Sequence, residues 1–306
     1  MRISRILLAF VLALAAPLTA CGGSDGGAAV AANGVPKTLR VGLIPNVAPD
    51  RQKAQYGPFG DYLEHALGVQ VELFVAADYA GVVTALASGR IDLAYLGGLT
   101  YVQAERQVGL TPLVTEIDRE TGTPRYLSAI VVRAASPYRN LRSDIVGPGR
   151  TFAFGDVSST SGSLYPRIML DAAGVRCSTR RMDECPPLKR VTFTGGHDAT
   201  AAAVLGGRAD AGGIELRILH RLEREGKVPA GALRVIETRQ VMGYPWVART
   251  ALGDRAVQAL ARAFTTMRDP RTLELMRARR YTRVAARDYD EVRRQAGRLG
   301  LGGAVR

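Results

Sequence analysis

Residues 79–109 read YAGVVTALASGRIDLAYLGGLTYVQAERQVG and change from a helical pattern to an extended one and back. Each helical stretch is followed by a glycine, a residue that favours the left-handed conformation closing a helix. The pattern predicts a helix over 79–88, a strand over 91–96 and a helix over 101–108. Such an alternation is typical of an α/β fold.

The same alternation continues on both sides of this stretch. Upstream it predicts strands at 39–44 and 69–75 with a helix at 56–67 between them. After a mostly extended stretch over 113–133, a second series follows: strands at 151–154, 190–194 and 209–214, and helices at 165–173, 198–205 and 216–225. Residues 254–300 read as helical and rich in arginine. Two such series predict two α/β lobes with parallel-rich sheets.

Length and composition agree with two lobes and exclude several other classes. The chain has 306 residues, of which 47% are apolar, and only 3 are Cys. These values exclude a disordered chain and a disulfide-framework miniprotein, and the length exceeds one ordinary compact domain. The formal net charge of +13 is compatible with nucleic acid, an anionic membrane or an anionic ligand, so it does not choose among them.

The N-terminus has the pattern of an export signal. Arg2 and Arg5 precede an apolar run of residues 6–20, which is short for a bilayer-spanning helix. The run ends in Leu-Thr-Ala-Cys21, which resembles the lipobox of bacterial lipoproteins. This resemblance implies cleavage after residue 20, lipidation of Cys21 and a position on the outer face of the cytoplasmic membrane or its periplasmic side. An ordinary cleaved signal with a chance cysteine is the alternative.

Cleavage would remove two arginines and lower the net charge from +13 to +11. Residues 21–38 are rich in Gly, Ala and Ser and read as a flexible tether. A flexible segment of this length has a root-mean-square reach of about 23 Å.

The other two cysteines, Cys177 and Cys185, flank a short polar loop. Because an exported chain meets oxidising conditions, we expect them to form a local disulfide. A zinc site is the alternative, but no further Cys or His has ligand spacing around them, so no metal is expected.

Polar residues gather at four joints between a predicted strand and the next helix. The joints carry Asp78-Tyr79, Gly97-Gly98-Leu99-Thr100-Tyr101, Ser158-Ser159-Thr160-Ser161-Gly162-Ser163 and Gly195-Gly196-His197-Asp198, without Lys or Arg. In open α/β sheets, ligands bind beyond the carboxyl ends of strands, where helix N-termini expose free N–H groups. Neutral donors of this kind suit a small tetrahedral oxyanion. Each joint taken alone also reads as an ordinary helix cap or packing residue.

The order of these motifs over residues 39–248 resembles the phosphate, phosphite and phosphonate-binding proteins of ABC importers. That resemblance implies a two-lobed periplasmic-binding-protein fold of type II, with a hinge, that closes on its ligand and passes it to a membrane permease and ATPase complex. It assigns the phosphorus oxygens to the serine-threonine-serine loop and the histidine, and a cage to first-lobe tyrosines. In this sequence these residues are Ser159, Thr160, Ser161, His197, Tyr79 and Tyr101.

The resemblance also bears on the organic group of the ligand. In aminoalkylphosphonate binders an acidic residue holds the amine, and Glu215 lies near that position, although it also reads as a helix-start carboxylate. The later segment 240–246 lacks a second acidic residue, and its Tyr244 lines the pocket or packs the hinge. The lack of this second acidic residue departs from the pattern of amine-binding members and favours a small ligand such as phosphate, phosphite or methylphosphonate. Asp198 or Glu215 would accept a hydrogen bond from a protonated ligand oxygen.

We therefore expect residues 39–132 plus 241–306 to form lobe 1 and residues 133–240 to form lobe 2. The expected protein is a monomeric, extracytoplasmic solute-binding lipoprotein that needs no cofactor. A sensor protein that presents the same ligand to a receptor shares every site residue. A phosphoester hydrolase is disfavoured, because no Gly-x-Ser-x-Gly elbow lies between a predicted strand and helix.

The charge surplus lies largely in a C-terminal run of arginines that acidic residues interrupt. It reads as a solvated helical face, with contact to anionic lipid headgroups as the alternative. Nucleic acid is not an expected partner, since export removes that polymer.

Overall fold

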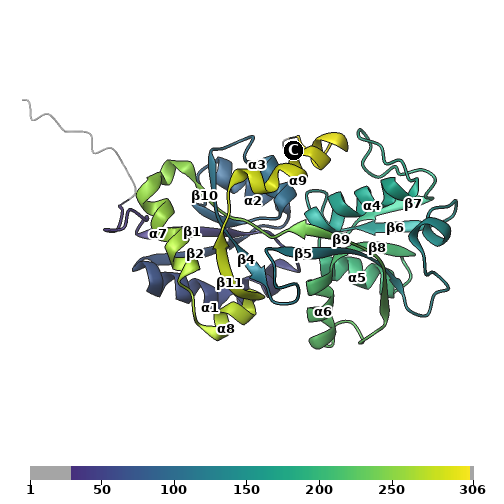
Figure 1. The fold of residues 1–306 in the computed structure, drawn as a ribbon, viewed down its shortest axis with the longest axis horizontal. Coiled ribbons are helices and arrows are strands. Elements are labelled where there is room, and N and C mark those ends of the chain that lie inside the picture. The colour runs from purple at the N-terminus through teal and green to yellow at the C-terminus, as the bar shows by residue number, and fades with distance from the viewer. Residues whose placement is uncertain (1–28, 304–306) are drawn as a thin grey trace, which may run out of the picture.

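The computed structural model describes residues 29–303 and contains two mixed β-sheets, each flanked by helices. Figure 1 shows the sheets side by side along the long axis of the molecule. The predicted two-lobed α/β architecture is confirmed.

The first sheet contains six strands in the order β11-β4-β10-β3-β1-β2. They are β1 Thr38–Leu43, β2 Gln70–Val75, β3 Leu93–Tyr95, β4 Leu110–Asp118, β10 Trp246–Arg249 and β11 Ala278–Arg283. β1 pairs in parallel with β2 and β3, whereas β10 and β11 pair antiparallel to their neighbours. The accompanying helices are α1 Pro49–Leu67, α2 Tyr79–Ala87, α3 Gly98–Ala104, α7 Gly253–Thr265, α8 Pro270–Leu275 and α9 Asp290–Arg298, with short 3-10 turns at Thr250–Leu252 and Ala286–Tyr289.

The second sheet contains five strands in the order β7-β6-β8-β5-β9. They are β5 Arg125–Arg133, β6 Thr151–Phe154, β7 Arg190–Phe193, β8 Ala211–Glu215 and β9 Leu233–Met242. β6 is parallel to β7 and β8, and β5 is antiparallel to β8 and β9. Its helices are α4 Tyr165–Ala173, α5 His197–Leu205 and α6 Leu216–Arg224, with π-helical turns η1 Leu141–Ile145 and η2 Thr160–Leu164.

The chain crosses between the sheets twice in this core region, over residues 119–124 and over residues 243–245. β5 follows the first crossing and pairs entirely within the second sheet, although our expected lobe 1 ran to residue 132. The extended stretch over 113–133 is thus two long strands, one for each sheet. Because both crossings are short, the ends of β4, β5, β9 and β10 lie near one another at the centre of the molecule (Figure 1).

The C-terminal region differs from the helical prediction. Residues 278–283 form β11, an edge strand of the first sheet, although their arginines are typical of a solvated helix. Tyr281 explains the difference, because its buried ring packs edge-on against Phe264 of α7 at 5.1 Å and fixes one face of the strand. β9 and β10 were not predicted either, and both pair antiparallel, so the sheets are less parallel than expected.

The end of the expected tether is also folded. Val30 and Pro36 form an isolated antiparallel bridge around an Asn33-Gly34 turn, in which Gly34 has φ of +83°. Val35 is fully buried in the first core. Asn-Gly is a strong turn signal that the glycine-rich composition obscured.

An aromatic cluster forms the centre of the first core. Trp246 lies 4.9 Å, ring to ring, from each of Phe59, Tyr95 and Phe264. Each such pair adds about 0.5–1.5 kcal/mol beyond the area it buries. These contacts tie β10, which follows the second crossing, firmly to the first sheet.

The expected disulfide between Cys177 and Cys185 is present. Among residues 29–303 no helix is long and apolar enough to span a bilayer. The signal peptide and Cys21 lie outside the described residues.

Candidate functional site

The serine-threonine-serine loop follows the carboxyl end of β6, as the joint pattern predicted. The Ser159 hydroxyl accepts a hydrogen bond from Gly162 N at 3.0 Å and caps η2. Ser159, Thr160 and Ser161 are at most 2% exposed. Ser128 of β5 donates to the carbonyl of Ser161 at 2.9 Å, so the neighbouring strand supports the loop. The loop is therefore held rigidly inside the protein.

The N-terminus of α3, in the first-sheet unit, contacts this loop directly. Leu99 N donates to Thr160 Oγ1 at 2.9 Å, and Thr100 Oγ1 donates to the carbonyl of Ser158 at 3.0 Å. A Cβ on Gly97 would lie 2.8 Å from Thr160 Oγ1, closer than such contacts normally occur. Glycine at this position allows the two units to meet.

His197 begins α5 and packs against the same loop, since a Cβ on Gly162 would lie 3.1 Å from its Cε1. Its Nδ1 accepts a hydrogen bond from Glu215 N at 3.3 Å. An accepting Nδ1 assigns the ring proton to Nε2 in the neutral form. Burial lowers the pKa of His197 to about 4, although Glu215 and Asp198 oppose this shift, so the ring is neutral at pH 7.

Two tyrosines converge on Asn46, which follows β1. The Tyr79 hydroxyl lies 2.9 Å and the Tyr244 hydroxyl 3.3 Å from Asn46 Oδ1. Burial raises the pKa of both tyrosines well above the ordinary value. Both hydroxyls therefore stay protonated and act as hydrogen-bond donors.

Several buried polar atoms in this region have no hydrogen-bond partner within residues 29–303, among them Ser163 Oγ of the same loop and, in the neighbouring arginine network, Arg217 Nη2 and Arg277 Nε. Three of them are neutral donors around the serine-threonine-serine loop: Ser161 Oγ, His197 Nε2 and the hydroxyl of Tyr126 in β5. Burial raises the pKa of Tyr126 and Glu215 adds to the effect, while the neighbouring Ser161 hydroxyl opposes it. Unpaired buried donors are costly, and native proteins rarely keep several together without a ligand. Because all three groups are neutral donors, an oxyanion is the ligand they fit.

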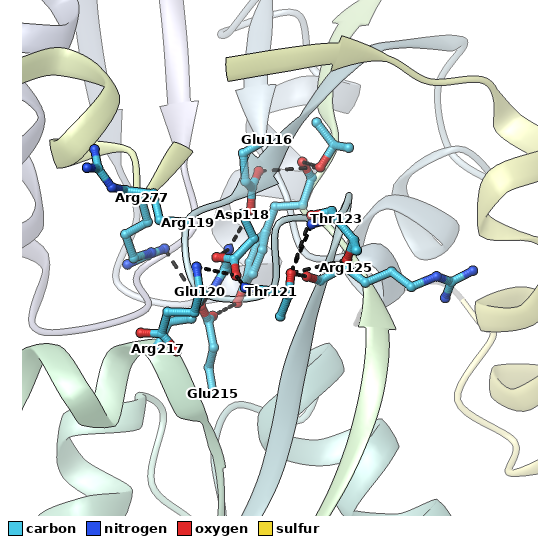
Figure 2. A network of polar contacts seen from close by, with 12 residues as sticks. Glu116, Asp118, Arg119, Glu120, Thr121, Thr123, Arg125, Glu215, Arg217 and Arg277 are labelled. Carbon is cyan, nitrogen blue, oxygen red and sulfur yellow. Dashed lines mark hydrogen bonds and ion pairs between the residues drawn. The ribbon is translucent and has the colours of Figure 1, made fainter. Parts of the chain in front are cut away.

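A buried ion network joins the two units (Figure 2). Arg217 of α6 donates Nε to Glu215 Oε1 at 2.7 Å, and its Nη1 lies 2.9 Å from both Glu116 and Asp118 of β4. Arg277, which precedes β11, lies 3.7 Å from Glu215. Arg217 also stacks over the ring of Tyr126, with its Cζ 4.5 Å from the centroid.

The network determines the charge of Glu215. Burial alone would raise the pKa of this carboxyl, but Arg217 and Arg277 overcome that effect and lower it to about 2. Burial raises the pKa of Glu116, which Arg217 only partly offsets. Glu215 is therefore ionised and already neutralised by protein groups.

Two predicted site residues lie elsewhere. The Tyr101 ring packs edge-on against Tyr289 at 5.2 Å, and its hydroxyl is 3.5 Å from Arg293 Nη2, on the side of α3 that faces α9. Asp198 accepts from Ala48 N at 3.3 Å and pairs with Arg51 at 3.7 Å, with its side chain 21% exposed. Neither side chain joins the buried donors, because each is engaged by residues outside them.

The prediction missed Asn46, Tyr126, Arg217 and Arg277. Asn46 follows the carboxyl end of β1, so the rule applied to the four joints would have identified it. Tyr126 follows the first crossing, which was not recognised as such. The two arginines read as ordinary surface residues in the sequence, because only the fold brings Arg217 to Glu116 and Asp118, and Arg277 to Glu215. No group of three or more potential metal ligands occurs among the described residues.

Comparisons with known proteins agree with this geometry. A profile of the family described as "ABC transporter, phosphonate, periplasmic substrate-binding protein" matches residues 41–291. The chain is 34% identical over 249 residues to the phosphate-import protein PhnD of Mycolicibacterium smegmatis, covering 80% of this chain and 77% of that protein. It is 27% identical over 273 residues to a probable phosphite-binding protein of an ABC transporter, PhnD1 of Prochlorococcus marinus, covering 84% and 88%.

Solved structures show the same fold. PhnD1 from Prochlorococcus marinus in complex with methylphosphonate matches with a TM-score of 0.76 at 25% identity, covering 87% of this chain and 99% of that chain. A binding protein of an ABC phosphonate transporter from Pseudomonas aeruginosa matches with a TM-score of 0.75 at 21% identity, covering 86% of each chain.

Proposed function

We propose that this chain, which belongs to the family of periplasmic substrate-binding proteins of ABC phosphonate transporters, captures a small phosphorus oxyanion between its two sheets. The observation that carries the proposal is the set of buried donors without partners: Ser161 Oγ, His197 Nε2 and the Tyr126 hydroxyl. Each is neutral and fits an anion oxygen. Capture between the units agrees with delivery of the ligand to an importer.

The remaining predicted residues shape this site. Ser159 and Thr160 hold the loop, through the η2 cap and the contact with Leu99. The Tyr79 hydroxyl donates to Asn46 Oδ1, and the Tyr244 hydroxyl donates to Glu215 Oε2. The three unpaired donors come from the second-sheet unit, and in this assignment Tyr79 and Asn46 of the first-sheet unit close the site from the other side, so ligand binding favours the arrangement in which the units are together.

The proposed ligand lacks an amino group. A buried ammonium needs a carboxylate that is not already paired. Both oxygens of Glu215 are engaged, Oε1 by Arg217 and Oε2 by Tyr244. Phosphate, phosphite and methylphosphonate meet this condition, and the names of the relatives from Mycolicibacterium smegmatis and Prochlorococcus marinus support the same group of compounds.

We place the lobe boundaries at the two crossings, residues 119–124 and 243–245, in place of the boundary first expected at residue 133. We also propose that the protein is an exported, monomeric lipoprotein, anchored through Cys21 to the outer face of the cytoplasmic membrane. Mass spectrometry of the membrane fraction would detect an acyl mass on Cys21, and Cys21→Ala would release the protein. Light scattering coupled to size exclusion tests the monomer.

Calorimetric titration tests the binding proposal directly. The purified protein is titrated with phosphate, phosphite and methylphosphonate, and its thermal unfolding is followed with each. We expect heat and a higher unfolding temperature with at least one compound. A folded protein that shows neither response to any of the three would overturn the proposal.

We propose further that binding occurs without turnover. A nucleophilic serine needs a hydrogen bond to a base that accepts its proton. Ser161 Oγ has no such bond, since neither it nor His197 Nε2 has a hydrogen-bond partner within residues 29–303. A phosphomonoester assay with the same preparation is therefore expected to give no product, and steady release of phosphate would contradict this proposal.

A further inference from the structure

We infer that Asp198 is a positioning residue that ties the two lobes together around the ligand, and that it sets the residence time of the ligand without touching it. This inference rests on the proposed function. It concerns one interlobe contact, formed by residues 46–51 of lobe 1 and residues 197–198 of lobe 2.

Backbone and side chain both contribute to the 46–51/197–198 contact. His197 N donates to the carbonyl of Asn46 at 3.0 Å, and Ala48 N donates to Asp198 Oδ2 at 3.3 Å. Arg51 Nη1 lies 3.7 Å from the same carboxylate oxygen. All three interactions join the segment after β1 to the first turn of α5, so they exist only while the lobes are together.

The exposed fraction of the side chains increases along this contact from Asn46 to Arg51. Asn46 is 3% exposed, and the side chains of Asp198 and Arg51 are 21% and 45% exposed. A surface hollow of about 240 Å³ is lined from both sides: lobe 1 supplies Pro45, Val47, Ala48, Pro49 and Ala77, and lobe 2 supplies Thr194, Gly195, Gly196, Asp198 and Ala199. Asp198 thus lies at the outer edge of the cleft, whereas the proposed ligand donors Ser161 and His197 are buried behind it.

The carboxylate of Asp198 is occupied by protein donors. Oδ1 accepts from Ala199 N at 2.9 Å, within the first turn of α5, and Oδ2 accepts from Ala48 N. The first interaction survives lobe separation, but the second does not. Asp198 therefore stabilises the joined state, and it contributes equally whichever phosphorus compound is bound.

The two interactions of Oδ2 differ in strength. An ion pair with a half-exposed arginine is weak, whereas a hydrogen bond from a backbone N–H to a carboxylate is stronger. Loss of the hydrogen bond from Ala48 N should accelerate ligand release about tenfold, since about 1.4 kcal/mol corresponds to a factor of ten. Loss of the ion pair with Arg51 should change the release rate by less than about threefold.

The test measures association and dissociation rates of phosphate, phosphite and methylphosphonate by stopped flow or surface methods. The variants are Asp198→Ala, Asp198→Asn and Arg51→Gln. We expect Asp198→Ala to raise the dissociation rate by about the same factor for every compound. Asp198→Asn keeps an acceptor for Ala48 N and should restore most of the residence time.

Glu184→Ala is the matched control. Glu184 pairs with Arg181 at 2.7 Å, and both residues lie in the disulfide loop of lobe 2, so this pair does not connect the lobes. Its loss should leave both rates unchanged. Thermal unfolding without ligand shows whether each variant is folded.

Two results would overturn the inference. The first is a dissociation rate that Asp198→Ala leaves unchanged. The second is an increase in the dissociation rate that differs strongly among the compounds, which would place Asp198 in contact with the ligand. If Asp198→Ala does not fold, Ala48→Pro decides, because it removes the N–H that donates to Asp198 at a residue whose φ of −44° proline can adopt, and release must again be faster by the same factor for every compound. If the wild type binds none of the compounds, the proposed function fails instead. The contact then predicts a larger radius of gyration for ligand-free Asp198→Ala than for wild type by X-ray scattering, and equal radii would contradict it.

Discussion

The hydroxyl of Tyr244 donates a hydrogen bond to Oε2 of Glu215 at 2.5 Å, and thereby joins the second interlobe crossing to the end of β8. The other carboxylate oxygen of Glu215 accepts from Arg217 Nε. Since Arg217 also reaches Glu116 and Asp118, the candidate ligand site and the crossings are parts of one hydrogen-bonded system. Glu215 therefore belongs to the framework of the site.

This role predicts how the protein treats an amino group on the ligand. An ammonium brought to Glu215 would have to displace Arg217 or Tyr244, and it would sit near two guanidinium groups. We expect 2-aminoethylphosphonate to bind no more tightly than methylphosphonate. Competition calorimetry against methylphosphonate measures the difference.

The control for this comparison is ethylphosphonate, which has nearly the same length but no charge on its substituent. If 2-aminoethylphosphonate bound tenfold more tightly than ethylphosphonate, Glu215 would have to be free for the ligand. The assignment of Glu215 to the framework would then be wrong.

Removal of Arg217 should strongly destabilise the protein. Within residues 29–303, Arg217→Met would leave Glu116, Asp118 and Glu215 buried, with Arg277 at 3.7 Å as the remaining ion-pair partner of Glu215. Breaking a buried ion pair from one side costs roughly 3–5 kcal/mol, because the remaining charge is uncompensated. Urea unfolding at pH 7 measures this loss.

Arg181→Ala is the comparison variant for Arg217→Met. Its ion pair with Glu184 is similarly short at 2.7 Å, but the two side chains are 73% and 42% exposed. The free energy of unfolding should fall by less than about 1 kcal/mol. Equal losses from both substitutions would show that burial does not govern the contribution of Arg217.

Removal of the unpaired donors should weaken binding and spare stability. Ser161→Ala and Tyr126→Phe delete hydroxyls that have no partner within residues 29–303, so the ligand-free protein loses no hydrogen bond. A hydrogen bond to a charged group contributes about 1.5–3 kcal/mol, which predicts affinity losses of at least about tenfold. Calorimetry with the tightest ligand and thermal unfolding without ligand check both parts.

Tyr101→Phe distinguishes the structure from the sequence-based assignment. Its hydroxyl faces Arg293 at 3.5 Å and not the donors, so its removal should leave ligand affinity within about twofold of wild type. A tenfold loss would return Tyr101 to the ligand cage.

The contrast between Ser161 and Tyr101 explains how far the sequence could predict the site. Local rules predicted that the serine-threonine-serine loop and His197 follow strand ends, and the structure has them after β6 and β7. Their contact with a ligand stays a prediction. Tyr101 obeys the same rule, but α3 begins at Gly98, so Tyr101 lies one turn further along the helix and faces α9. A shift of three residues in a helix start was enough to move a side chain to another face.

An element of the fold was predictable where the hydrophobic pattern of its own residues defined it. The strand at 151–154 and the helix at 165–173 match the structure residue for residue. β9, β10 and β11 were missed because each pairs antiparallel with a strand that is distant in the sequence, and no local pattern indicates such a pairing. Arg217 and Arg277 were missed for a related reason, since Arg217 meets Glu116, and Arg277 meets Glu215, only after the lobes assemble.

The buried His197 should make stability depend on pH. Its pKa is about 4 in the folded protein against an ordinary value of 6.5, because burial disfavours the charged ring. Between these values the unfolded chain binds a proton that the folded chain does not, so stability falls as the pH decreases through this window. Above about pH 6.5 this destabilisation is nearly absent. Between pH 7 and pH 5.5 it lowers the free energy of unfolding by about 1 kcal/mol.

His197→Gln keeps an acceptor for Glu215 N but removes the group that takes up the proton. We expect the free energy of unfolding of this variant to change about 1 kcal/mol less between the two pH values than that of the wild type. Urea unfolding of both proteins at pH 7 and pH 5.5, without phosphate in the buffer, gives the comparison, and an equal loss in wild type and variant would show that His197 takes up its proton as readily when folded as when unfolded.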